Sequence, residues 1–598
     1  MNYQLQNKSK AILYSLIILA LLLGVVGFVV APVEKVASYI VQSKTAEIAE
    51  RAVLEAGGEI VSRLSLINGV TANLSESQKT VLENNPEIIA ITPNSEVKLT
   101  SSEFDSDDEK KGKVSADYPE VVGADVVWSE GITGNGITVA VLDTGIAKLP
   151  GLSKSADGNN KRMIGWFDAI EGGSKPLDPN GHGTHVAGII ANSDIGADKA
   201  WNGVAPNVNL VGVRVLDENG YGTYDNVISG LQWVVDNKSK YKIRIVNLSL
   251  VSMVESPYWA DPLNQAVTAA WAKGLTVIVA AGNEGPAPMS ISNPGNNPYV
   301  VTVGAFTDAF TPEDWSDDYI ADFSAAGPTL DGFVKPDLVA PGGHIVSLAP
   351  EKSVLNREYP DNRLASSYFQ MSGTSQATAV TTGVAALILA KEPKLTNDQV
   401  KYRLTSTAYY WLDQNADEEL YSMWQQGAGR LNAVDAVFSE EKTSANDGMN
   451  IQADLSGEEH YEGYSYFDEE TETFKLYAPF DTISSRYGIW SGDYGIWSGR
   501  YGIWSGGTNA WAARKGIWSG GESVWSGRKG IWSGRKGIWS GGYTQWFTDQ
   551  DILAGRKGIW SGRKGIWSGS DFITSFANGE APNSDIKEAT ISNFLLDD

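Results

Sequence analysis

Four short segments, far apart in the sequence, carry side chains that could together attack a carbonyl group. They are VLDTGI with Asp143, NGHGTHVAG with His182, AAGNEG with Asn283 and SGTSQATA with Ser375. A serine hydroxyl becomes a good nucleophile when a base removes its proton and a third group orients that base. A side-chain amide can then donate a hydrogen bond to the oxyanion. These residue types therefore predict acyl transfer, provided that the fold brings them together.

Each residue also has a simpler interpretation. Ser375 precedes an apolar run and could only cap a helix. His182 and His185 could bind a metal, although the glutamate of a zincin motif is missing. Asp143-Thr144-Gly145 could be a turn, or half of an aspartic-protease pair, but the sequence has no second Asp-Thr-Gly. The presence of the whole set in one domain favours acyl transfer over these alternatives.

The segment 118–440 alternates buried strands with helices. Near-continuous apolar runs at 136–143, 208–216, 243–250 and 275–283 predict strands, and the spacing predicts helices at 224–237 and 262–273. Such runs are typical of parallel strands that helices cover on both faces. Asp143 and Asn283 each close a run, at the strand end where open α/β sheets bind ligands. The predicted fold class is therefore α/β, with a parallel sheet and helices on both faces.

The four segments as a set resemble the signature blocks of the subtilisin-like serine proteases, the subtilases (peptidase S8 type). Their order, Asp then His then Ser, is that of subtilisin. The segment GAGRLNAVDAV at 427–437 resembles the family's closing segment. The resemblance covers residues 118–440, and it implies a subtilisin-like fold and a serine endopeptidase that hydrolyses peptide bonds through an acyl-enzyme.

The resemblance also assigns roles. Ser375 would be the nucleophile and His182 the general base. Asp143 would orient the imidazole, and Asn283 would form the oxyanion hole with the backbone N–H of Ser375. The residues implied to contact the substrate are Ser249, Leu250, Val251, Gly220 and Gly222. The chemistry needs no cofactor. Structural Ca²⁺ is expected from the family, but no loop matches a calcium site and the metal ligands stay unknown.

The sequence departs from the family pattern at three positions. Gln376 follows the nucleophile where the family usually has Met, and Ala379 stands where it usually has Pro. Neither position transfers a proton, so these changes bear on helix packing rather than on catalysis. Val251 stands where many members have Gly, and its side chain is expected to narrow the primary specificity pocket.

The N-terminal segment, residues 1–117, predicts an exported zymogen. Residues 1–32 contain the uncharged apolar run 11–31 after two lysines, which predicts a signal peptide or a membrane anchor and a secreted or extracytoplasmic protein. Residues 45–100 form a small α+β unit with the capping box Ser75–Gln78, and this unit resembles the family's inhibitory propeptide. Residues 101–117 are a charged linker that is expected to contain the maturation site. We expect the protease to cut itself there, and such a cut would release it from an anchor.

The C-terminal part contains a tryptophan repeat. Residues 441–483 are predicted as a linker or small β extension, 484–569 as Trp-containing heptads and 570–598 as an acidic tail. Two glycines per heptad disfavour a helix, and an odd spacing would turn successive tryptophans to opposite faces of one strand. The repeat therefore predicts short strands stacked as a solenoid or folded ribbon. A structural role and contact with a cell surface or polysaccharide both remain open.

Composition excludes several classes. The net charge of −25 argues against nucleic acid and anionic lipid as partners. The absence of cysteine excludes a thiol nucleophile and disulfides. Protein or peptide substrates and the chain's own propeptide are the expected partners, together with a membrane through residues 11–31. The alternative function is a surface-binding or adhesive repeat protein whose protease domain mainly processes itself.

Overall fold

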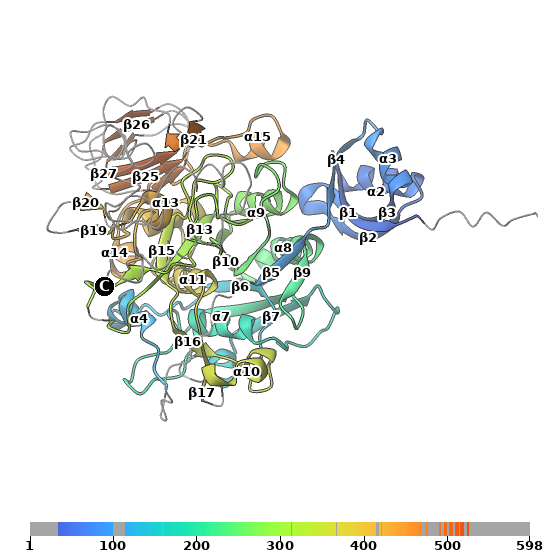
Figure 1. Ribbon diagram of the computed structural model, residues 1–598. Helices are drawn as coiled ribbons and strands as arrows, with labels where there is room; N and C mark the ends of the chain where they lie inside the picture. Colours follow the sequence, from blue (N-terminus) through green and yellow to red (C-terminus); the bar gives the residue numbers. More distant parts are fainter. Residues whose placement is uncertain are drawn as a thin grey trace, which may run out of the picture.

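The computed structural model of this 598-residue chain describes residues 34–99 and 114–463, apart from 157, 159–160, 313, 366, 414–417 and 420, and short strands between 465 and 525. The apolar run 11–31, most of the linker 101–117 and the acidic tail 570–598 lie outside these residues. Within the described ranges, no helix is both long enough and apolar enough to cross a bilayer. Figure 1 shows a small N-terminal unit beside a larger α/β body.

The N-terminal unit is a four-stranded antiparallel sheet with two helices. Its elements are β1 (Val36–Ser43), α2 (Ala46–Glu55), β2 (Glu59–Leu64), β3 (Gly69–Ser75), α3 (Glu76–Glu83) and β4 (Ile88–Pro93), with strand order β2-β3-β1-β4. The Ser75–Gln78 capping box opens α3 as predicted. The unit begins at Val36 rather than at residue 45, because β1 pairs with both β3 and β4 and is essential to the sheet.

The body is built on an eight-stranded sheet. Its strands are β6 (Thr138–Asp143), β7 (Met163–Asp168), β8 (Asn209–Arg214), β10 (Ile243–Leu248), β12 (Thr276–Ala280), β13 (Val301–Thr307), β14 (Tyr319–Ile320) and β15 (Leu338–Pro341). The order is β14-β13-β12-β10-β6-β8-β7, with β15 also paired to β13. All pairings are parallel except β13 with β14. The mostly parallel sheet confirms the predicted α/β class.

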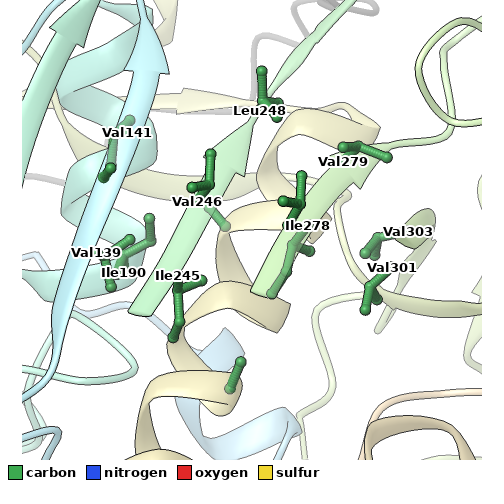
Figure 2. Packing of buried hydrophobic residues seen from close by; sticks show 14 of the residues in the cluster. Val139, Val141, Ile190, Ile245, Val246, Leu248, Ile278, Val279, Val301 and Val303 are labelled. Carbon is green, nitrogen blue, oxygen red and sulfur yellow. The ribbon is translucent and has the colours of Figure 1, made fainter. Parts of the chain in front are cut away.

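The sheet lies between two pairs of helices. The pair α7 (His182–Ala191) and α11 (Thr374–Lys391) packs together on the sheet, and so does the pair α8 (Tyr224–Tyr241) and α9 (Pro262–Ala272). Figure 2 shows Val139, Val246 and Ile278 from neighbouring strands in one continuous apolar layer. All six residues of β6 are buried, as its apolar run predicts. Because β7 and β8 follow β6 on one side and β10 and β12 on the other, the carboxyl end of β6 is a topological switch point.

Smaller elements complete the body. They are α4 (Tyr118–Val121), α5 (Ala124–Ser129), α6 (Pro150–Ser153), β9 (Tyr221–Thr223), β11 (Leu250–Val251), β16 (Ile345–Leu348), α10 (Val354–Glu358), β17 (Arg363–Ala365), β18 (Tyr368–Met371), α12 (Asn397–Ser406), β19 (Leu412–Asp413), β20 (Glu418–Glu419), α13 (Met423–Gln426) and α14 (Ala433–Phe438). The strand that follows the N-terminal unit, β5 (Glu96–Leu99), also belongs to the body, because it pairs with β9 and β11.

The predicted linker or β extension at 441–483 begins as an ordered part of the body. Helix α15 (Ile451–Ser456) packs on α9. The carboxylate of Asp454, 6% exposed, accepts hydrogen bonds from the hydroxyls of Tyr258 (2.7 Å) and Tyr299 (2.8 Å) and contacts His460 Nδ1 at 2.8 Å. Residues 441–463 therefore fasten to the body, and the short hairpin of β21 (Ser465–Asp468) and β22 (Thr473–Leu476) follows them.

Strands in the tryptophan repeat pair in parallel at a spacing of two heptads. One sheet contains β23 (Ile489–Ser491), β25 (Tyr501–Ser505) and β27 (Lys515–Ser519), and another contains β24 (Ile496–Ser498), β26 (Asn509–Ala512) and β28 (Ser523–Trp525). Trp490, Trp504 and Trp518 are register partners in the first sheet. Consecutive heptads therefore alternate between two sheets. The repeats after Trp525 lie outside the described residues.

Candidate active site

Asp143 and His182 meet at the switch point of the sheet. Asp143 ends β6 and His182 begins α7, and both side chains are fully buried. Asp143 Oδ1 lies 2.8 Å from His182 Nδ1 and accepts a second hydrogen bond from the Thr144 N–H at 2.8 Å. A Cβ atom at Gly183 would overlap the carbonyl oxygen of Gly145, so glycine is required for the two segments to approach this closely. Among the described residues, His182 Nε2 has no hydrogen-bond partner.

The neighbouring histidine is structural. His185 Nε2 lies 3.1 Å from the carbonyl oxygen of Phe369. Burial, with a smaller contribution from His182, lowers the pKa of His185 to about 3, so its imidazole stays neutral. The two imidazoles therefore face different partners, and the described residues hold no group of three or more His, Asp or Glu side chains that could bind a metal. This geometry gives the metal-site interpretation of His182 and His185 no support.

Ser375 lies at the N-terminus of the central buried helix. It is the second residue of α11, and nearly the whole helix is buried. Helices α7 and α11 pack against each other, and their first residues include His182 and Ser375 respectively. Ser375 Oγ donates to the carbonyl oxygen of Ser249 at 3.2 Å, and Ser249 Oγ donates to the carbonyl oxygen of Ser375 at 3.0 Å. The serine is therefore joined to the segment that leads into β11.

Asn283 follows β12, at the same edge of the sheet. Its Oδ1 accepts hydrogen bonds from the N–H (3.0 Å) and hydroxyl (2.7 Å) of Thr374, the residue before Ser375. Because a backbone N–H can only donate, these bonds fix which amide atom is oxygen. The Asn283 Nδ2 group is buried and has no partner among the described residues. The amide is thus oriented by the residue that precedes Ser375, with its two N–H donors without a partner among the described residues.

We expect Asn283→Leu to lower kcat by about 10²–10³-fold with little change in KM, the loss found when the matching donor of subtilisin is removed. Leucine keeps the shape but donates no hydrogen bond to the developing oxyanion. Steady-state hydrolysis of a peptide anilide measures both constants, and thermal melting checks the fold. A loss smaller than tenfold in a folded variant would contradict the role of Asn283.

The five predicted substrate contacts lie on both sides of one strand. Strand β5 runs antiparallel between β9 and β11. Leu99 pairs with Leu250 and donates its N–H to the Gly220 carbonyl oxygen at 3.0 Å. Val97 pairs with Gly222 and is fully buried. The remaining predicted contacts, Ser249 and Val251, lie on the β11 side. The chain's own segment 96–99 therefore lies between β9 and β11, where the resemblance predicts the substrate cleft.

The paired residues Val251 and Lys98 differ in burial. Val251 pairs with Lys98 and is 5% exposed, so its side chain is part of the packed wall rather than a free surface. Lys98 is exposed and lies 3.7 Å from the exposed carboxylate of Glu284, a contact that contributes little energy in water. Burial at Val97, not charge, therefore anchors the strand.

Sequence reasoning missed three residues that hold this site together. Thr374 orients Asn283, and Thr144 binds Asp143 through its N–H. Asp178 is a buried carboxylate four residues before His182. It accepts hydrogen bonds from Thr144, which follows Asp143, and from Thr184, two residues after His182. The short spacing from Asp178 to His182 was the available signal, because an acidic residue just before a helix commonly accepts its first N–H groups.

Gln376, at the position where the family usually has Met, lies in an intact helix. Both Gln376 and Ala379 are fully buried in α11. The helix therefore packs in the body with Gln and Ala at the two positions where the family usually has Met and Pro. However, both polar atoms of the Gln376 side chain are buried and have no hydrogen-bond partner among the described residues. A buried polar group without a partner costs roughly 1–3 kcal/mol.

We therefore expect Gln376→Met to raise the unfolding free energy by about 1 kcal/mol or more, since methionine has a similar shape and leaves no polar atom unpaired. Urea unfolding of the variant in a Ser375→Ala background, which prevents self-digestion, measures the change. The charged variant Gln376→Glu should be less stable than the parent. A lower stability for Gln376→Met would mean that the amide has a partner in the folded protein.

Three comparisons relate this chain to known proteins. The Subtilase family model matches residues 134–441. Serine protease AprX of Bacillus subtilis (strain 168) is 41% identical over 312 residues, which are 51% of this chain and 67% of that protein. Subtilisin DY of Bacillus licheniformis is 35% identical over 290 residues, 48% of this chain and 89% of that protein.

The crystal structure of fervidolysin from Fervidobacterium pennivorans aligns with a TM-score of 0.53 at 23% identity, covering 70% of this chain and 62% of that one, and shows the shared fold alone. The family match and the close relatives favour an enzyme over the adhesive-protein alternative. Subtilases need no cofactor for catalysis. The chain therefore belongs to the subtilase family and is a serine endopeptidase of the subtilisin type.

Proposed function

We propose that the protein is an exported, self-processing zymogen that uses Asp143, His182 and Ser375 as its catalytic triad. The observation that carries this proposal is the place of β5, which fills the cleft between β9 and β11 and ends beside the segment bonded to Ser375. A strand held in this way resembles a bound substrate, and it belongs to the same chain as the nucleophile.

In this mechanism Ser375 Oγ attacks the carbonyl carbon of the scissile peptide bond. His182 takes the hydroxyl proton at Nε2, because Nδ1 faces Asp143 Oδ1 at 2.8 Å. The buried carboxylate stabilises the imidazolium, which then gives the proton to the leaving amine. Water attacks the acyl-enzyme in the same manner and restores the Ser375 hydroxyl.

The oxyanion that forms at each attack is stabilised by fixed donors. Asn283 supplies its Nδ2 group, and Ser375 supplies its backbone N–H at the N-terminus of α11. Both donors are oriented before substrate arrives, since Thr374 holds the Asn283 oxygen. Little reorganisation is needed when negative charge develops, which is the condition for a large electrostatic effect on rate.

The N-terminal unit, residues 36–93, acts as the intramolecular inhibitor. It contacts the first turn of α8, where Asp225 accepts hydrogen bonds from the hydroxyls of Ser62 and of Thr71 (2.9 Å for Thr71). The Asp225 N–H donates to Asn94 Oδ1 at 2.9 Å. These bonds and the β5 pairing hold the unit over the cleft, so the zymogen excludes other substrates until the unit dissociates.

The register of β5 supports a specific position for the proposed maturation site. Leu99 pairs with Leu250, and the residue before Leu250 is Ser249, whose carbonyl oxygen lies 3.2 Å from Ser375 Oγ. In an antiparallel pair the nucleophile therefore lies one residue beyond Leu99 in the direction of the linker. We expect the cut at the start of residues 100–113, which gives a mature chain that begins at Ser101 or Ser102.

N-terminal sequencing of purified full-length protein tests this function. Wild type should yield a chain that begins at Ser101 or Ser102, whereas Ser375→Ala should remain uncut. A first residue beyond Tyr118 would contradict the β5 register. Equal cutting of purified Ser375→Ala would contradict self-processing by this serine.

Export and release are tested by fractionation. If the apolar run 11–31 anchors the zymogen, wild type should release its catalytic domain and Ser375→Ala should stay with membranes. Equal solubility of the two catalytic domains would exclude release by self-cleavage.

Calcium binding and surface contact by the tryptophan repeats stay predictions. Deleting the segment after Asp481 tests the repeat: loss of attachment to cells or polysaccharide with intact peptide hydrolysis would assign it a targeting role.

A further inference from the structure

A third buried carboxylate lies between the segments that carry Asp143 and His182. Asp178 stands in the loop before α7 and is 6% exposed. Its two oxygens accept hydrogen bonds from the hydroxyl of Thr144 (2.9 Å), the N–H of Gly181 (2.8 Å), and the N–H (2.8 Å) and hydroxyl (2.6 Å) of Thr184. Burial raises the pKa of this carboxyl, and the hydrogen bonds oppose that rise. Each oxygen of this carboxylate accepts two hydrogen bonds from donors within the protein.

One side of this network ends at Asp143. Thr144 donates its hydroxyl to Asp178 and its N–H to Asp143 Oδ1, the oxygen that faces His182. The same hydroxyl accepts the N–H of Gly183 at 3.0 Å. Thr144 is thus tied to both carboxylates and to the helix that begins at His182. Moving Asp178 would move the turn that aims Asp143.

The other side of the network fixes the peptide units around His182. Gly181 and Thr184, one residue before and two residues after His182, both donate their N–H groups to Asp178. These are among the first N–H groups of α7, which have no acceptor inside the helix. The negative charge also lies at the positive end of the helix dipole. The backbone that carries the imidazole is therefore held on both sides.

We propose that Asp178 is a positioning residue that holds the Asp143 turn and the His182 turn in one fixed relation, so that the hydrogen bond between Asp143 and His182 is formed before substrate binds. This inference rests on the proposed triad. Asp178 acts through Thr144, Gly181 and Thr184 and does not contact the reacting atoms. Only a carboxylate offers acceptors on both oxygens, since an asparagine would present an NH₂ group to donors on one side.

The test is Asp178→Asn in the full-length protein, with Asp454→Asn as the matched control. Both carboxylates are 6% exposed and accept several side-chain or backbone donors, but Asp454 lies in the C-terminal extension and not beside the triad. We expect Asp178→Asn to lower kcat by about 10²-fold with KM within about twofold of wild type, because small displacements of catalytic groups have effects of this size. Asp454→Asn should lower the melting temperature and leave kcat unchanged.

A second pair of variants keeps the test decisive if Asp178→Asn does not fold. Thr144→Val removes the hydroxyl between the two carboxylates and should lower kcat about tenfold, the effect of roughly one hydrogen bond. Thr144→Ser keeps the hydroxyl and should restore kcat. Where Asp178→Asn does fold, its combination with Thr144→Val should lower kcat by less than the product of the two single losses, because both act through one network.

Unchanged kcat in a folded Asp178→Asn or Thr144→Val variant would overturn the positioning role and leave the triad intact. Equal kcat losses in Asp178→Asn and Asp454→Asn would also overturn it, since the effect would then be one of general stability. Failure of the triad itself is seen separately, as activity retained by Ser375→Ala.

Discussion

Ser375→Ala should lower the rate of peptide hydrolysis by about 10⁶-fold, a figure known from removal of the matching serine of subtilisin. Alanine removes the oxygen that is proposed to form the acyl-enzyme, while His182 and Asp143 remain paired at 2.8 Å. A fluorophosphonate probe should label wild type at Ser375 and should not label the variant. Turnover of a peptide anilide, followed by mass spectrometry of the probe adduct, measures both effects.

The same substitution should leave the zymogen folded and prevent its self-cleavage. Alanine loses the hydrogen bond from Ser375 Oγ to the Ser249 carbonyl oxygen but fits the fully buried position at the start of α11. Full-length Ser375→Ala should therefore accumulate uncut, with the N-terminal unit still docked on α8. Retained casein hydrolysis, or probe labelling at another side chain, would require a different nucleophile.

Much of the fold follows from local sequence pattern. The runs that were expected to be strands contain β6, β8, β10 and β12, and each structural strand is shorter than its run. The difference arises because apolar residues continue past the paired segment into the following loops, as at Ala281 and Leu216. Hydrophobic runs report burial, whereas strand ends depend on where the neighbouring strand stops pairing. The α/β class is therefore predictable and the element boundaries are less so.

In the N-terminal unit, strand β1 could not be predicted from the sequence. Strand β1 has an ordinary sequence, VASYIVQS, between an apolar run and a capped helix, and nothing local marks it as a central strand. Its place depends on β3 and β4, which follow it in the chain, and long-range pairing of this kind leaves little trace in one sequence. The position of β5 in the cleft has the same origin, since its partners lie in the body.

The proposed triad could be predicted from the sequence because its segments combine rare side chains with glycines, and the structure brings two of these segments into contact through Asp143 and His182. The roles of Asp178, Thr144 and Thr374 were not predicted, because they depend on hydrogen bonds that form only in the folded protein. The strand pairing of the heptads was also only partly predictable from the sequence. An odd period excludes one flat strand, but the pairing of residues two heptads apart comes from the alternation of two sheets.

Asp143→Asn should lower kcat by about 10⁴-fold, the size found for this change in other Ser-His-Asp proteases. In this chain the fall is expected to come mainly from lost charge. Asp143 Oδ1 accepts both the His182 and Thr144 hydrogen bonds, while Oδ2 has no partner among the described residues. An asparagine could place its oxygen at Oδ1 and its NH₂ at Oδ2, and so keep both bonds with a neutral group.

Kinetics and a structure of the variant together separate charge from geometry. If charge dominates, Asp143→Asn should show an unchanged 2.8 Å contact between residues 143 and 182, a normal KM and the full loss in kcat. If the NH₂ group instead turns toward His182, Nδ1 must accept rather than donate, and the proton moves to Nε2, where it blocks the uptake of the serine proton. That outcome would appear as a loss of the Thr144 hydrogen bond as well, because Thr144 donates to the same oxygen. A loss in kcat below about tenfold with either geometry would mean that the buried carboxylate is not needed to stabilise the imidazolium, and His182 would have to act without it.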